Sequence, residues 1–226
     1  MTYELGVIGG MGPLATNVFY QYLIDHTVAH SDQDHINTIL LSHASMPDRT
    51  ASILSGNTEA LLRAMQSDFA LLNPLGLKAI AIPCNTSHYF YDTLTSLTDT
   101  PIINMVEETI RTCAAQGEKK VAVLATAGTL RSGVYAQYAD RYGITCTDIA
   151  EDDAAKVMDI IYAVKRENRR DFPALLEMID RYSRSARVIL ACTELSCIPI
   201  GKRNAVDALK VLGTEAIRKC RGDVKL

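Results

Sequence analysis

Two cysteines, Cys84 and Cys192, occupy matched positions 108 residues apart in this chain. Cys84 ends the run Ala-Ile-Ala-Ile-Pro-Cys and is followed by Asn-Thr-Ser-His, while Cys192 ends the run Val-Ile-Leu-Ala-Cys and is followed by Thr-Glu-Leu-Ser. Each thiol is therefore expected where a short apolar strand gives way to a polar turn. Two such corners can place one sulfur on either side of a small molecule, as a two-base proton-transfer enzyme requires.

Cysteine suits this chemistry because its ordinary pKa, about 8.5, lies close to neutral pH. A helix N-terminus beside a thiol lowers its pKa, and both cysteines are expected to precede one. Asn85, Thr86 and Thr193 follow the two thiols and are candidate hydrogen-bond donors to a substrate carboxylate. Such donors matter because removal of an α-proton pushes negative charge onto the carboxylate.

The competing interpretation is that Cys84 and Cys192 are small buried hydrophobic residues, as most free cysteines are. Their paired occurrence in Cys-Asn-Thr and Cys-Thr-Glu favours catalysis. The remaining cysteines lack this context and are assigned to packing: Cys113, Cys146, Cys197 and Cys220. Six cysteines in 226 residues are too sparse for a disulfide scaffold, and no Cys-x-x-Cys pair indicates zinc, so no metal site is predicted.

The elements that must position these residues follow an α/β pattern. Short apolar runs alternate with longer segments of helical period, which is typical of strands and crossover helices in a parallel sheet. The predicted strands are 4–8, 38–41, 79–83, 101–103, 120–124, 145–148 and 187–191.

The chain also repeats itself, which predicts two pseudosymmetric α/β halves with the active site in the cleft between them. The strand at 5–8 followed by Gly-Gly-Met-Gly-Pro corresponds to the strand at 121–124 followed by Ala-Thr-Ala-Gly-Thr, and the run after Asn104 resembles the run after Asn204. We expect one half to comprise residues 1–100 with 206–226, because the last helix returns to it, and the other to comprise 101–205.

Composition excludes several classes of protein. Hydrophobic residues make up 48% and charged residues 22%, which is ordinary for a globular protein. The formal net charge of −3 leaves no basic excess for nucleic acid. No apolar stretch is long enough to cross a membrane, and the start lacks a signal-peptide pattern, so the expected location is the cytoplasm.

Four motifs in order resemble the aspartate racemase branch of the aspartate/glutamate racemase family: Gly-Gly-Met-Gly-Pro-Leu-Ala-Thr from Gly9, Met-Pro-Asp-Arg-Thr from Met46, Pro-Cys-Asn-Thr from Pro83 and Cys-Thr-Glu from Cys192. The resemblance covers nearly the whole chain. It implies a homodimeric racemase that needs neither pyridoxal phosphate nor metal. One cysteine thiolate takes the α-proton, and the other thiol returns a proton from the opposite face.

The same resemblance suggests residues for the substrate's second carboxylate. Arg49, expected in a loop after the second strand, offers a guanidinium fork that matches a carboxylate. Lys165 matches a family lysine that faces the same group. The glycine-rich turn lacks the spacing and the acidic residue of a dinucleotide site. We therefore expect its backbone, at Gly12, to approach a substrate carboxylate, and Met11 to line the pocket.

Two neighbours of the thiols have open roles. His88 lies four residues after Cys84 and is either a structural histidine or a group that polarises the thiol. Glu194 either tunes Cys192 or serves as an ordinary acid at a helix start. Two departures from relatives fall on this side: Ala191 stands where glycine is common, and the abridged segment 197–204 is expected to lack a short strand.

These observations lead to one hypothesis, a cytoplasmic, cofactor-independent aspartate racemase with a small-molecule substrate. The alternatives within the superfamily are glutamate or broader specificity, hydantoin racemisation, maleate isomerisation and malonate decarboxylation. A third class is a non-catalytic carboxylate-binding protein. Solvent exchange of the α-proton separates the enzymes that act on amino acids from a binding protein.

Overall fold

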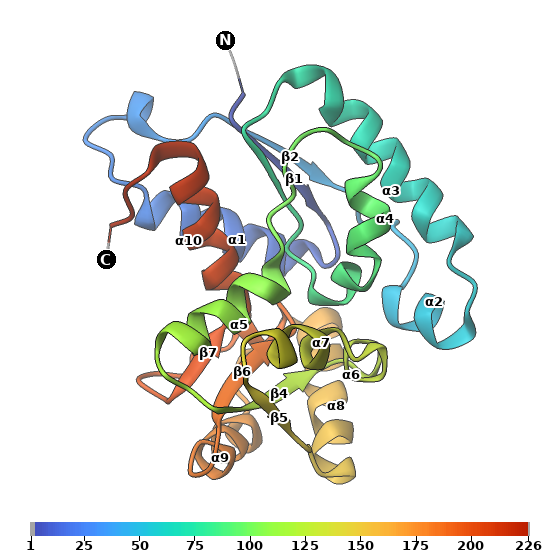
Figure 1. The fold of residues 1–226 in the computed structure, drawn as a ribbon, viewed down its shortest axis with the longest axis vertical. Coiled ribbons are helices and arrows are strands. Elements are labelled where there is room, and N and C mark those ends of the chain that lie inside the picture. Colours follow the sequence, from blue (N-terminus) through green and yellow to red (C-terminus); the bar gives the residue numbers. More distant parts are fainter. Residues whose placement is uncertain (1–2, 226) are drawn as a thin grey trace.

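The computed structural model describes residues 3–225 and places them in two parallel sheets with helices on both faces (Figure 1). The first sheet has the strand order β2-β1-β3, and the second has the order β5-β4-β6-β7. All strand pairs are parallel, and the register of β1 with β2 matches Leu5 to Thr38. The expected class, α/β with two parallel-sheet halves, is confirmed.

The elements of the first half are β1 (Leu5–Gly9), α1 (Pro13–His26), β2 (Thr38–Ser42), α2 (Arg49–Ser55), α3 (Glu59–Leu72), β3 (Ala79–Ala81) and α4 (Tyr91–Thr95). The chain continues with α5 (Met105–Ala115), β4 (Lys120–Ala125), α6 (Ala127–Ser132), α7 (Val134–Arg141), β5 (Thr145–Thr147), α8 (Glu151–Glu167) and α9 (Pro173–Tyr182). It ends with β6 (Arg187–Ala191), β7 (Ala205–Asp207) and α10 (Ala208–Arg221). Short 3-10 helices occur at Asp32–Asp34, Asn73–Leu75, Asn85–Phe90 and Leu195–Cys197.

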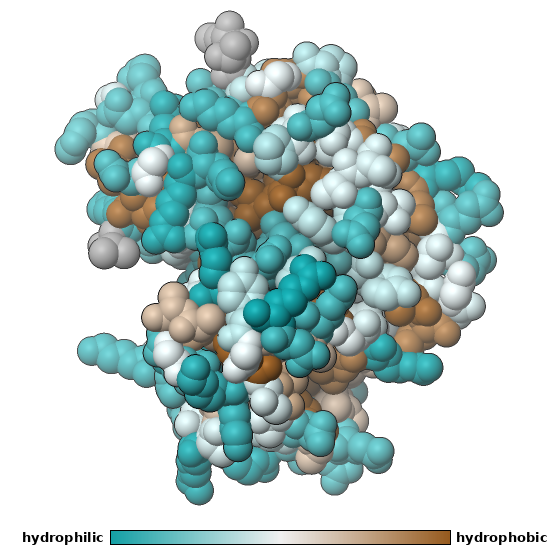
Figure 2. Space-filling view, viewed as in Figure 1, coloured by the Kyte–Doolittle hydropathy of each residue, from teal (hydrophilic) through white to brown (hydrophobic). Residues whose placement is uncertain are grey.

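The central strands are buried on both faces, and their side chains alternate between two cores. In β1, Leu5 and Val7 pack toward α1 and α10, whereas Ile8 packs toward α3. In β4, Val121 packs toward α5 and α7, whereas Ala122 packs toward α8 and α9. This alternation follows from the two-residue period of a strand. In the view of Figure 2, hydrophilic residues cover most of the surface and apolar residues form separate patches.

Two helices cross between the sheets. Helix α5 follows the first sheet along the chain, yet its Ile110 belongs to the core of the second sheet. Helix α10 follows the second sheet, yet its Leu209 packs in the core that includes Leu5 of the first. The two helices also contact each other (Figure 1). The return of the last helix to the first half was expected, while the exact domain boundaries stay a prediction.

The structure corrects three details of the strand assignment. Residues 101–103 do not form a strand and contribute only an isolated bridge between Ile80 and Ile102. Conversely, the strand expected to be missing after segment 197–204 is present as β7, which pairs with β6. The final helix begins at Ala208 instead of near 206.

The repeat between the halves is also shifted from the expected alignment. Asn104 caps α5 by accepting a hydrogen bond from the backbone of Glu107, and Asp207 caps α10 by accepting from the backbone of Leu209 and Lys210. The true counterpart of Asn104 is therefore Asp207 and not Asn204, because both residues link the outermost strand position to a crossing helix. Between residues 3 and 225, no helix is long and apolar enough to cross a membrane.

Candidate active site

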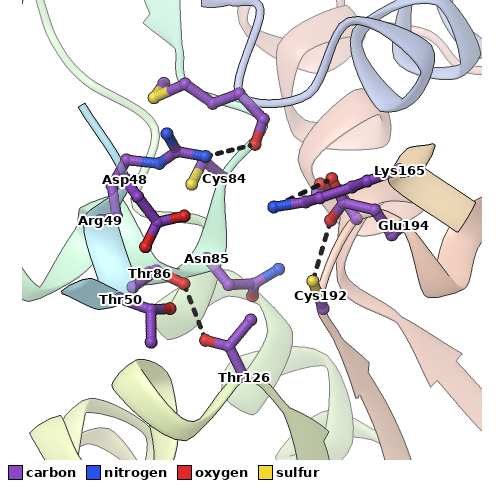
Figure 3. A pocket seen from close by; sticks show the side chains of 12 residues that line it. Asp48, Arg49, Thr50, Cys84, Asn85, Thr86, Thr126, Lys165, Cys192 and Glu194 are labelled. Carbon is purple, nitrogen blue, oxygen red and sulfur yellow. Dashed lines mark hydrogen bonds and ion pairs between the residues drawn. The ribbon is translucent and has the colours of Figure 1, made fainter. Parts of the chain in front are cut away.

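The two predicted acid-base thiols line one pocket between the halves, which we call the inner pocket (Figure 3). Cys84 follows β3 and Cys192 follows β6, so each lies at the carboxyl end of its sheet. The first half contributes Met11, Arg49, Cys84, Asn85 and Thr86, with Asp48 and Thr50 beside Arg49. The second half contributes Thr126, Lys165, Cys192, Thr193 and Glu194. Figure 3 shows the Cys84 and Cys192 sulfurs on opposite sides of the inner pocket.

Arg49 is the positive group on the Cys84 side. It is the first residue of α2, so the expected loop position is wrong, and Asp48 caps this helix by accepting from the backbone of Ala51. Burial opposes the charge of Arg49, but a negative Cys84 sulfur and the carboxylates of Asp48 and Glu194 raise its net pKa. The guanidinium therefore lies close enough to Cys84 to interact with a thiolate there.

The contacts of Arg49 are mostly with backbone carbonyls. Its Nη2 donates to the oxygen of Met11 at 2.9 Å, and its Nη1 donates to the oxygens of Pro47 at 3.0 Å and Met46 at 3.4 Å. Its Nε is buried and has no hydrogen-bond partner among residues 3–225. Arg49 thus ties the β1–α1 turn to the start of α2, while its Nε–H donor stays free.

The Cys192 side carries the opposite charge. The Cys192 Sγ donates to Oε2 of Glu194 at 2.9 Å. Burial, followed by the charge of Glu194, raises the pKa of Cys192 well above its ordinary value. The expectation that a helix N-terminus would lower the pKa of this thiol is wrong, because a turn and a three-residue 3-10 helix follow it and the sulfur is enclosed. Cys192 therefore rests as a protonated thiol.

Lys165, in the last turn of α8, lies beside Glu194 on the same side of the pocket (Figure 3). Its Nζ is 3.8 Å from Oε1 of Glu194, and its side chain is 27% exposed. Burial lowers the pKa of Lys165, but the negative charge of the Glu194 carboxylate opposes this effect, and the net pKa of Lys165 is raised. The ammonium group consequently stays charged while it balances the Glu194 carboxylate.

Neutral donors form the floor of the inner pocket. Asn85 accepts a hydrogen bond from the hydroxyl of Tyr135 at 2.6 Å, while its buried Nδ2 has no partner within residues 3–225. The Thr86 hydroxyl bonds to those of Thr126 at 3.1 Å and Thr129 at 2.9 Å. These contacts join the two halves directly beneath the thiols.

His88 does not reach the inner pocket. Its Nδ1 lies 2.9 Å from the carbonyl oxygen of Cys84, and its Nε2 accepts from the backbone N–H of Met105 at 3.1 Å. Burial lowers the pKa of His88, so a neutral imidazole that donates through Nδ1 satisfies both contacts. Both ring nitrogens of the histidine therefore bond to backbone atoms, and the contact with Cys84 is to its carbonyl oxygen and not to its thiol.

A wider cavity, the outer hollow, adjoins the inner pocket. It shares Met11, Asp48, Arg49, Lys165 and Glu194 with the inner pocket and adds Gly10, Gly12, Pro13, Leu14, Ala44, Met46 and Val164. Pro13 and Ala44 are exposed, so the outer hollow reaches the surface. Gly10 has a φ of 85°, and an added Cβ there would collide with the backbone of His43, so glycine permits the turn that presents Met11.

Sequence reasoning thus named most of the inner pocket but missed Asp48, Thr50 and Thr126. Asp48 and Thr50 stand inside the quoted Met-Pro-Asp-Arg-Thr motif, next to Arg49. Thr126 follows β4 at the place where the Gly-rich turn follows β1, so the internal repeat was the signal that could have found it. Within residues 3–225, no group of three histidine, cysteine or acidic side chains is arranged to hold a metal ion.

Comparison with known proteins places this geometry among racemases. The chain is 27% identical over 203 residues to the broad specificity amino-acid racemase RacX of Bacillus subtilis, covering 86% of each protein. Its structure is similar to that of Picrophilus torridus aspartate racemase, with a TM-score of 0.85, 28% identity, and coverage of 96% of this chain and 94% of that one.

More distant glutamate racemases share the fold. The enzyme from Francisella tularensis, solved in complex with D-glutamate, is similar with a TM-score of 0.66 and 17% identity, covering 95% of this chain and 79% of that one. The model of the Asp/Glu/Hydantoin racemase family matches residues 8–216. With nearly its whole length matched and two facing thiols in its cleft, the chain is an isomerase of the racemase type and belongs to the Asp/Glu/Hydantoin racemase family.

Proposed function

We propose that this protein is a cofactor-independent aspartate racemase in which Cys84 and Cys192 are the acid-base pair. The observation that carries the proposal is the opposite electrostatic setting of the two thiols in one pocket: Cys84 faces the Arg49 guanidinium, and Cys192 donates to the Glu194 carboxylate. A positive partner favours a thiolate and a negative partner favours a thiol. Cys192 is therefore suited to act as the acid, and Cys84, next to a cation that stabilises a thiolate once it forms, is suited to act as the base.

The proton transfers follow from this asymmetry. The Cys84 thiolate takes the α-proton from one face of the bound amino acid, and the electron pair moves into the α-carboxylate. The Cys192 thiol then delivers its proton to the opposite face, which inverts the centre. The enzyme is left with a Cys84 thiol and a Cys192 thiolate, the form that runs the reverse reaction.

The α-carboxylate must be held where negative charge develops. The free Nδ2 of Asn85, the hydroxyl of Thr86 and Thr193 surround the inner pocket and support this role. Unpaired buried donors are costly, so a site that holds one is suited to an anion that pairs with it. These neutral donors bind the α-carboxylate in the ground state and keep pairing with it as negative charge develops in the transition state.

The side-chain carboxylate of aspartate is proposed to bind between Arg49 and Lys165. The buried, unpartnered Nε of Arg49 supports this assignment, as does the ammonium of Lys165 on the facing wall. Met11 and Gly12 would close the subsite from the β1–α1 turn. A substrate carboxylate there would compete with Glu194 for Lys165.

A second candidate, racemisation of a broader set of amino acids, is favoured by the outer hollow. Lys165 is already balanced by Glu194, and most donors of Arg49 are taken by carbonyl groups. The adjoining hollow has apolar walls that include Leu14 and Val164, and it extends the space available to a longer side chain. A Bacillus subtilis relative carries the name of a broad specificity racemase.

The deciding experiment is racemisation of each standard amino acid by purified protein in deuterated water, with chiral analysis and detection of α-proton exchange. The hypothesis predicts racemisation and exchange with aspartate, and loss of racemisation by about 10²- to 10⁴-fold in Cys84→Ser and in Cys192→Ser. Cys146→Ser is the matched control, because Cys146 lies outside the inner pocket. Absence of exchange with every amino acid would refute the proposal.

The same assay separates the remaining alternatives. Activity on glutamate or on many amino acids would select the broader candidate, and products from hydantoins, maleate or malonates would select another superfamily reaction. Binding of aspartate without exchange would select a carboxylate-binding protein. The proposed enzyme uses no cofactor because the two thiols supply both acid and base, and we expect a cytoplasmic homodimer.

A further inference from the structure

We infer that Tyr135 is a positioning residue that sets the orientation of the Asn85 amide, so that the amide NH2 group faces the substrate's α-carboxylate. This inference rests on the proposed function, since it assigns a role within that binding site. Tyr135 lies on α7 of the second half, and Asn85 follows Cys84 in the first half. The contact therefore crosses between the two halves.

The hydrogen bond itself has little freedom. The Tyr135 hydroxyl donates to Oδ1 of Asn85 at 2.6 Å, and both side chains are at most 3% exposed. Burial raises the pKa of Tyr135 above its ordinary value, so the hydroxyl keeps its proton and remains a donor. With Oδ1 occupied, the two hydrogens of Nδ2 point into the inner pocket, where Figure 3 shows the amide nitrogen.

The orientation matters because the two ends of an amide have opposite polarity. If the Asn85 amide were reversed, its carbonyl oxygen would face the substrate carboxylate and repel it. A hydrogen bond accepted by the carbonyl also polarises the amide and makes its N–H groups stronger donors. Tyr135 therefore acts on the substrate only through Asn85, without touching the substrate itself.

The chain offers a matched control three residues along the same helix. Tyr138 is also buried, and its hydroxyl accepts a hydrogen bond of 2.6 Å from Asn104. Asn104 caps α5, and neither residue lines the inner pocket. Removal of either tyrosine hydroxyl therefore breaks one short buried bond to an asparagine, but only one of these asparagines faces the site.

The test compares Tyr135→Phe with Tyr138→Phe in the full chain. We expect Tyr135→Phe to raise the KM for aspartate about tenfold and to change kcat by less than about threefold. Without the tyrosine hydroxyl, the Asn85 amide can rotate away from the orientation that binds the substrate carboxylate. Tyr138→Phe should leave both constants within about twofold of wild type. Thermal unfolding of both variants measures how much stability each loses with its buried hydrogen bond, and we expect similar losses.

A second arm excludes a purely structural effect. In an Asn85→Ala background, adding Tyr135→Phe should not change the KM further, since the two residues act as one unit. Equal KM values for the two phenylalanine variants, or an undiminished effect in the Asn85→Ala background, would overturn the inference while leaving the racemase intact. A wild-type protein that neither binds nor racemises any amino acid would instead overturn the proposed function, and this inference with it.

Discussion

The Cys192 Sγ donates a hydrogen bond to Oε2 of Glu194 at 2.9 Å, and the other oxygen of that carboxylate lies 3.8 Å from Nζ of Lys165. The Cys192 thiol is thus linked through one carboxylate to a cation on the same side of the pocket. Because Lys165 and Glu194 also line the outer hollow, protonation at Cys192 is coupled to charges that solvent reaches. Among residues 3–225, no carboxylate accepts a hydrogen bond from Cys84, which instead lies beside Arg49. The two thiols therefore have opposite electrostatic surroundings.

Replacing Glu194 by glutamine should alter the pH profile of one reaction direction only. The pKa of Cys192 is raised first by burial and then by the charge and hydrogen bond of Glu194, so Glu194→Gln should lower that pKa while burial still keeps it above 9.0. The direction that uses Cys192 as base should then gain activity at lower pH. We expect the kcat of that direction to rise at neutral pH, by about tenfold for each unit by which the pKa of Cys192 falls.

The measurement is kcat against pH for each aspartate enantiomer separately. Glu215→Gln is the control, because Glu215 is a similarly buried acid that pairs with Arg111 and Arg218 away from the inner pocket. Identical shifts in both directions, or no shift at all, would contradict the assignment of Glu194 to Cys192.

Arg49→Lys should weaken aspartate binding and loosen the site. A lysine ammonium lacks the planar fork that reaches the carbonyls of Met11 and Pro47 together, and it also removes the free Nε donor. We expect the KM for aspartate to rise at least about tenfold and the free energy of unfolding to fall by about 1–2 kcal/mol. Steady-state kinetics and urea unfolding measure the two effects, with the exposed Arg63→Lys as control. An unchanged KM for aspartate would count against the role of Arg49.

Gly128→Ala should separate the two halves at the edge of the inner pocket. A Cβ at Gly128 of α6 would lie 2.9 Å from Cα of Thr50 in α2, which is too close for carbon atoms. Since backbone must move to relieve this contact, we expect a loss of about 1–3 kcal/mol in stability and a raised KM. Ser132→Ala, at the end of the same helix, is the control. A Gly128→Ala variant with wild-type melting temperature and KM would show that the halves do not press together here.

Stability should decline in alkaline solution because buried thiols resist ionisation. Burial raises the pKa of Cys113 from 9.0 to about 12, so the folded protein retains a proton that the unfolded chain releases. The stabilisation is complete below pH 9 and is lost progressively as the pH rises toward about 12. Cys113→Ala should therefore flatten the fall in unfolding free energy between these values, measured by urea titration across pH. A slope equal to that of wild type would contradict this account.

Features that depend on local pattern could be predicted from the sequence. The strands that end near Cys84 and Cys192 are apolar runs bounded by turn residues, and both the run and its end are visible within ten residues. The site at the carboxyl ends of the sheets followed from the parallel order. By contrast, β7 is only three residues long, too short to produce a recognisable alternation.

The rest of the site depends on contacts between distant segments. Arg49 was assigned to substrate alone because nothing local reveals that the carbonyl of Met11 lies 2.9 Å from its guanidinium. The raised pKa of Cys192 arises from enclosure by the assembled fold, which the sequence beside it does not report. Tyr135 is 50 residues from Asn85 in the sequence, and no local motif around either residue indicates that they form a hydrogen bond.

Because α5 and α10 pack against each other and against the two sheets, the relative position of Cys84 and Cys192 depends on the packing of both halves. Helix α10 covers the first sheet although it follows the last strand of the second, and α5, which contacts α10, covers the second sheet. Dividing the chain near residue 104 would leave the first sheet without α10, and it would leave the apolar face of α10 on the second fragment without the sheet that it covers. We therefore expect the two halves to unfold together in one cooperative step. The distance between the two sulfurs is then fixed by helices that pack against both sheets and does not depend on a flexible hinge.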